Sequence, residues 1–127
     1  VTGDVIGNLT GNVIGNLTGD VMGNVIGDTV ETKQLIINVD KKDSQNPTIG
    51  TGVILSDENS VSIKSEAVTD NSKIYITPIG STDNQVVYVG NIEKGKGFEV
   101  KVDRIDGIKK KDINFNWWII ESKEGGE

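Results

Sequence analysis

Apolar and polar residues alternate with a period of two in several short stretches after residue 32. Val61 and Ile63 alternate with serine and lysine, and Phe98, Val100 and Val102 alternate with glutamate and lysine. Such a stretch turns one side to a core and the other to solvent, as strands of antiparallel sheets do. Turn-forming residues separate the stretches at intervals of roughly ten residues, which is typical of a sandwich. The pattern predicts strands at Lys33–Val39, Ile49–Leu55, Ser60–Ser65, Lys73–Pro78, Gln85–Ile92, Gly97–Val102 and Ile113–Glu121.

The last predicted strand is apolar on both faces towards its end. Phe115, Trp117 and Ile119 share one side, whereas Trp118 and Ile120 share the other. Burial on both sides or a subunit interface would account for this, because tryptophan is enriched at interfaces. Stacking of Trp117 and Trp118 on sugar rings is the alternative interpretation.

The first 28 residues follow a different pattern. Glycine recurs at every fourth position, asparagine or aspartate follows each glycine, and Val or Leu follows every pair except the last. Glycine, Asn and Asp tolerate positive φ and can turn the chain, while the residues between them favour strands. The positions expected to form the turns and the core are Gly3, Val5, Gly7, Leu9, Gly11, Val13, Gly15, Leu17, Gly19, Val21, Gly23, Val25 and Gly27.

This repeat predicts a triangular β-prism with short sides and an apolar axis. Glycine at each fourth position disfavours a helix, and collagen needs glycine at every third. One chain supplies barely two coils of such a prism, whereas three intertwined chains bury the apolar column completely. We therefore expect a homotrimer, with a single-chain solenoid as the alternative. The predicted organisation is a stalk over residues 1–30, a connector over 31–48 and an antiparallel β-sandwich over 49–127, to which the strand at 33–39 also belongs.

Both parts resemble fibre proteins. The octads of residues 1–28 resemble the triple-stranded β-helix of bacteriophage cell-puncturing needles and the repeats of phage tail fibres, although a second glycine stands in each octad at Gly7, Gly15 and Gly23. Residues 60–63, 68–78 and 115–120 resemble segments of β-sandwich modules in bacterial and phage extracellular fibres. The resemblance implies an all-β fold and an extracellular, virion or cell-surface location, and it transfers no active site.

Composition and charge argue against several functions. The chain has no Cys and no His, which removes thiol chemistry, the commonest general base and the commonest metal ligand. Its net charge of −6 disfavours nucleic acid as a partner. No stretch approaches the about 20 apolar residues of a membrane span. We expect neither an enzyme nor a bound cofactor or metal.

Two functions remain on the sequence alone. The first is a virion or extracellular fibre, whose trimeric stalk displays a β-sandwich knob for attachment to a cell-surface glycan or protein. The second is a polymerising cell-surface filament, whose N-terminal repeat packs along or into neighbouring subunits. The partners expected in either case include further copies of the chain. Asn8 and Asn16 lie in N-glycosylation sequons, which the repeat itself also generates.

Overall fold

The structure is a computed structural model, which describes residues 6, 7, 10, 11, 14, 15, 18, 19, 21–38 and 46–123. The chain divides into two compact units, residues 1–35 and 36–127. The described part is all-β and contains six strands: β1 (Ile49–Ile54), β2 (Ser60–Lys64), β3 (Ser72–Ile79), β4 (Val86–Glu93), β5 (Gly97–Asp103) and β6 (Ile113–Glu121). Six of the seven predicted strands are therefore confirmed, with ends shifted by at most one residue.

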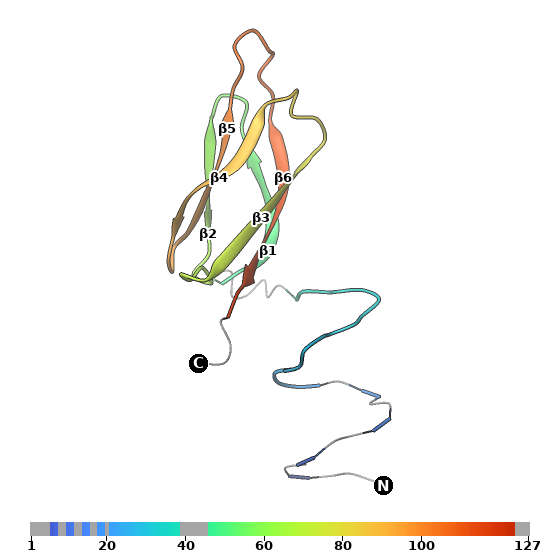
Figure 1. Cartoon of the computed structure of the whole chain (residues 1–127). Helices are drawn as coiled ribbons and strands as arrows, with labels where there is room; N and C mark the ends of the chain where they lie inside the picture. Colours follow the sequence, from blue (N-terminus) through green and yellow to red (C-terminus); the bar gives the residue numbers. More distant parts are fainter. Residues whose placement is uncertain are drawn as a thin grey trace. The chain divides into compact units, whose positions relative to one another are not determined.

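The six strands form two antiparallel sheets that pack against each other as a sandwich (Figure 1). Sheet A has the order β1-β6-β3 and sheet B has the order β2-β5-β4. The chain changes sheet after β1, β2, β3 and β5, so that only β4 and β5 form a hairpin between sequence neighbours. The central strands β5 and β6 carry the alternating apolar residues that the sequence singled out.

The core lies between the sheets and is lined by the inward positions of β5 and β6. Phe115, Val100 and Ile54 are fully buried, and Phe98 packs edge-on against Trp117 with ring centroids 5.3 Å apart. Burial of each such side chain stabilises a fold by about 1.5–3 kcal/mol. The buried apolar residues are Ile54, Val68, Phe98, Val100, Val102, Ile113, Phe115, Trp117 and Ile119.

One turn is fastened to the end of β6 by a carboxylate. The hydroxyls of Ser72 and Thr69 both donate to the Glu121 carboxylate, the Thr69 bond with an O···O distance of 2.6 Å. These hydrogen bonds, with Ser72 the larger contributor, hold the pKa of Glu121 below its ordinary value of 4.5. The start of β3 is thereby tied to its neighbour in sheet A.

The strand predicted at Lys33–Val39 is not formed. Residues 33–38 adopt no strand, and Val39 lies outside the described residues. Its composition suits a strand, but a strand exists only when another chain segment pairs with its backbone groups. No described segment pairs with residues 33–38, and this part of the prediction is therefore wrong for the single chain.

Candidate functional site

The repeat glycines share one backbone conformation. Gly7, Gly11, Gly15, Gly19 and Gly23 have φ between 121° and 132°, a region that L-residues with a side chain rarely adopt. Gly27 has no such φ, in the last and irregular octad. The five described glycines before Gly27 thus repeat a positive φ at every fourth residue. Gly3, Val5, Leu9, Val13 and Leu17 lie outside the described residues.

Apolar side chains of the repeat stand in solvent. Ile6, Ile14, Met22 and Ile26 are each more than nine-tenths exposed, and Val21 and Val25 are more than half exposed. The described residues of the repeat contain no strand. A regular series of exposed large apolar residues is unusual in a folded chain, which makes the repeat a candidate interaction surface.

The outer face of sheet A carries a second candidate surface. Three neighbouring rows cross the sheet from β1 through β6 to β3, and none contains a charged residue. Trp118 lies between Ile49 and Tyr75 in the first row, with the Tyr75 and Trp118 ring centroids 6.1 Å apart and tilted by 47°. The three rows are Ile49–Trp118–Tyr75, Thr51–Asn116–Thr77 and Val53–Asn114–Ile79.

The first two rows line a groove of about 540 Å³, together with Gly50 and Trp117. Tyr75 is 52% exposed and provides an accessible ring, while the side chains of Thr51, Thr77 and Asn116 are exposed beside it. Small-ligand sites are usually lined by aromatic faces with a few polar groups beside them. In this chain, which has a net charge of −6, the uncharged groove favours a neutral ligand.

The structure separates the two tryptophans that the sequence placed together. Trp117 is only 4% exposed and packs in the core against Phe98, which leaves it no accessible ring face for a ligand. Trp118 points to the opposite face of β6 and is half-buried beside Tyr75. Of the pair, only Trp118 is placed to contact a partner or a glycan.

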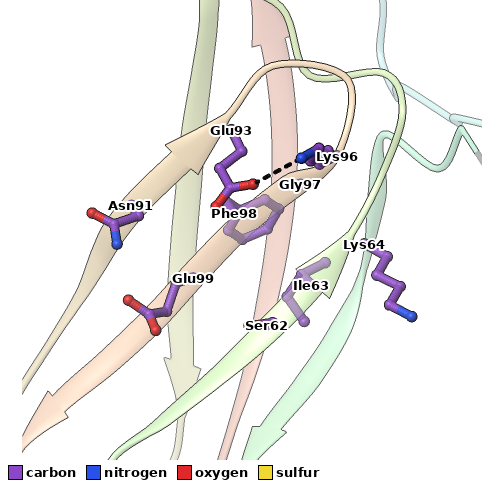
Figure 2. Close-up of a pocket in the computed structure, with 9 residues that line it drawn as sticks. All are labelled: Ser62, Ile63, Lys64, Asn91, Glu93, Lys96, Gly97, Phe98 and Glu99. Atoms are coloured by element: carbon purple, nitrogen blue, oxygen red, sulfur yellow. Dashed lines mark ion pairs between the residues drawn. The ribbon is translucent and has the colours of Figure 1, made fainter.

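A smaller hollow of about 210 Å³ lies between β2 and the β4–β5 hairpin (Figure 2). Charged side chains of both signs surround it, and Glu93 and Lys96 lie 4.0 Å apart across the turn. Glu99 is balanced by Lys101, with a Nζ···Oε1 distance of 3.6 Å. Glu93, Lys96 and Glu99 are thus compensated within the chain, and among the described residues Lys64 is the one charged lining residue without an ion pair. The hollow therefore offers less to a ligand than the groove on sheet A.

Other kinds of site have no support in the described chain. Within it, no group of three or more acidic residues is arranged to hold a metal ion. The same residues include no helix long and apolar enough to cross a membrane.

No family model, curated protein or solved structure matches this chain. The fibre resemblance therefore remains a prediction that rests on the residues themselves.

Besides Gly50, sequence reasoning missed five residues of the groove: Ile49, Thr51, Tyr75, Thr77 and Asn116. Each occupies a predicted strand at the right parity to share a face with its neighbours, which was the available signal. Their proximity follows from the sheet order β1-β6-β3, in which the three strands come from distant parts of the chain. Periodicity within one strand cannot supply that order.

Proposed function

We propose that the chain is a structural part of an extracellular or virion fibre. Residues 1–30 from three copies wind into a stalk, and each copy displays its β-sandwich for attachment to a cell surface. The observation that carries this proposal is the repeat itself: glycine in one left-handed conformation at every fourth residue, with exposed apolar side chains between. No enzymatic activity is part of the proposal.

Energetics favour three chains over one. Ordering the backbone costs about 1–2 kcal/mol per residue, and burial of each large apolar side chain returns about 1.5–3 kcal/mol. Because glycine at every fourth position buries no side chain, the repeat can offset this cost only if as many apolar side chains as possible leave water. A single chain leaves Val21 and Val25, two residues of the predicted apolar column, more than half exposed. A three-chain prism has an axis on which such side chains can meet.

The solution mass tests the stalk. We expect light scattering of the full chain to give three times the chain mass of 13.6 kDa. The double substitution of Gly11→Val and Gly19→Val should reduce the particle to one chain, because φ near 127° and 129° strains any side chain there. Near-ultraviolet circular dichroism should show an intact sandwich in both proteins.

The matched control is Gly27→Val, which makes the same chemical change at a glycine without positive φ. It should keep the wild-type mass. A monomeric wild type, or a doubly substituted chain that still forms trimers, would contradict the stalk. Long regular filaments in electron micrographs of the wild type would instead support the second candidate, a polymerising cell-surface filament.

Attachment is assigned to the groove on sheet A, with neutral saccharides as the ligand class. A pyranose ring has an apolar C–H face that suits the electron-rich face of an aromatic ring, and hydroxyls that suit threonine and asparagine side chains. Trp118 and Tyr75 provide the rings, and Asn116 lies in the adjoining row. This assignment explains why the rows combine aromatic rings with uncharged polar side chains and contain no charged residue.

Glycan binding tests the attachment site. We expect the wild type to bind a subset of neutral glycans on an array, and Trp118→Ala to weaken that binding at least about tenfold, a loss of about 1.4 kcal/mol. Tyr88→Ala is the control, because Tyr88 is an exposed tyrosine on the outer face of sheet B. This site would be contradicted if the Trp118→Ala protein bound the same glycans as strongly as the wild type, or if the wild type bound only acidic glycans.

A further inference from the structure

One edge of the sandwich lacks the features that normally prevent further strand pairing. The Ile119 amide donates to the Thr48 carbonyl with an N···O distance of 2.7 Å, which fixes the phase of the β1–β6 ladder. Alternate residues from Thr48 therefore turn their backbone groups towards β6, and Ile49, Thr51 and Val53 turn theirs away from the sheet. The described residues provide no backbone partner for these outward groups.

The other edge of sheet A is guarded. The Ser122 amide donates to the Asn71 carbonyl at 3.1 Å, so that the outward positions of β3 are Ser72, Ile74, Ile76 and Pro78. Pro78 has no N–H and blocks pairing at its position. Strand β1 contains no proline, charge or bulge.

The edges of sheet B are guarded by different means. Strand β2 has five residues, and Lys64 occupies one of its outward positions. Strand β4 has a bulge between Val89 and Ile92. Short strands, edge lysines and bulges are the devices that proteins use against unwanted strand addition. Only β1, among the described strands, is open to a new neighbour.

The same chain holds a strand-forming segment without a partner. Residues 33–38 read Lys-Gln-Leu-Ile-Ile-Asn, which equals β1 in length, and no described segment pairs with them. Leu35 is 67% exposed and Ile36 is 78% exposed. A free strand former and an unguarded edge are complementary, because each supplies the backbone hydrogen bonds that the other lacks.

We propose that residues 33–38 of one copy pair with the edge of β1 in a second copy and extend its sheet A to four strands. The inference rests on the proposed trimeric stalk, which ends at residue 30 and holds three segments close to three sandwiches at high effective concentration. Each copy gives one segment and receives one, and the ring closes after three such contacts. The sandwiches are then interlocked rather than tethered.

The interior of the sandwich beside β1 suits this addition. A side chain at Gly50 or Gly52 would meet the rings of Trp117 and Phe115, and these rings thus lie directly over the strand. Nε1 of Trp117 is buried and has no hydrogen-bond partner among the described residues. Inward side chains of an added strand, such as Leu35 and Ile37, would pack against the edges of these rings.

Engineered disulfides test the contact, because the chain has no cysteine of its own. Full-length Ile36→Cys and Thr51→Cys chains are mixed unfolded, refolded together and oxidised. We expect a disulfide-linked dimer of the two different chains on a non-reducing gel, removed by reductant. Gln34 and Asn38 on the segment, which share the outer face with Ile36, and Ile49 and Val53 on β1 complete the scan. Linking should follow a single register, because a disulfide needs a Cα···Cα distance of about 4.4–6.8 Å.

The matched control pairs Ile36→Cys with Ser62→Cys on the edge of β2, which should stay unlinked. Hydrogen exchange of the unsubstituted protein gives an independent readout. The amides of Ile49, Thr51 and Val53 should exchange at least about tenfold more slowly than the outward amides of β2, Ser60, Ser62 and Lys64.

The outcomes separate this inference from the stalk on which it rests. Trimers that show no link at any scanned pair, with fast exchange along β1, overturn strand addition and leave the stalk standing. A disulfide within one chain of the Ile36→Cys and Thr51→Cys double variant, without links between mixed chains, shows pairing within a copy and also overturns the proposal. A monomeric wild type would contradict both the stalk and the strand addition.

Discussion

Replacement of Gly97 by alanine should destabilise the sandwich severely. Gly97 has φ of 146°, and a Cβ there would overlap the carbonyl oxygen of Ile63 in the neighbouring strand β2. The backbone fixes the position of both the added Cβ and the carbonyl oxygen, so no side-chain rotation can relieve the overlap. The adjacent hydrogen bond from the Ser65 amide to the Lys96 carbonyl, 2.9 Å long, holds the two strands together at this point.

The expected loss exceeds about 4 kcal/mol, a large share of the about 5–15 kcal/mol that stabilises an ordinary domain. Urea unfolding followed by tryptophan fluorescence measures it. Gly95→Ala is the matched control in the same turn: its φ is 72°, but no atom lies near the position of the added methyl group. That change should cost only about 1 kcal/mol, from backbone strain. Similar losses for the two variants would show that the Gly97 contact is not decisive.

The second large effect is expected for Trp117→Ala. The indole is 4% exposed, packs edge-on against Phe98 and covers Gly50. Truncation of a buried tryptophan to alanine removes this packing and leaves a cavity, with a cost of about 3–5 kcal/mol. Denaturant unfolding should therefore show a much lower midpoint. Far-ultraviolet circular dichroism is the suitable probe, because its signal does not depend on the tryptophan that is removed.

Trp118→Ala makes the same chemical change one residue further along β6. Its ring lies on the outer face and contacts Tyr75, so that we expect a loss of only about 1 kcal/mol. The difference in stability between the two variants measures how much more the inner face of β6 is buried than its outer face. If Trp118→Ala is as destabilising as Trp117→Ala, the outer face of sheet A is covered by something more than solvent in the assembled protein.

These two comparisons mark the limit of what the chain reveals as a sequence. Val61 with Ile63, and Phe98 with Val100 and Val102, alternate with polar residues, and each of these strands could be placed within one residue. Side-chain direction in a strand depends only on position along it, which makes such patterns local and readable. Glycine at every fourth residue likewise predicted an unusual backbone conformation, and five of the six described glycines of the repeat have positive φ.

The tertiary structure decided what depends on distant partners. Phe115-Asn116-Trp117-Trp118-Ile119-Ile120 reads as apolar on two faces, and only the packing of sheet B selects Trp117 for the core. The closeness of Gly97 to Ile63 and the groove around Trp118 follow from strand order, which brings together residues far apart in sequence. The segment at 33–38 shows the same physics in reverse: a sequence can favour a strand, but the hydrogen bonds that make one belong to a neighbour.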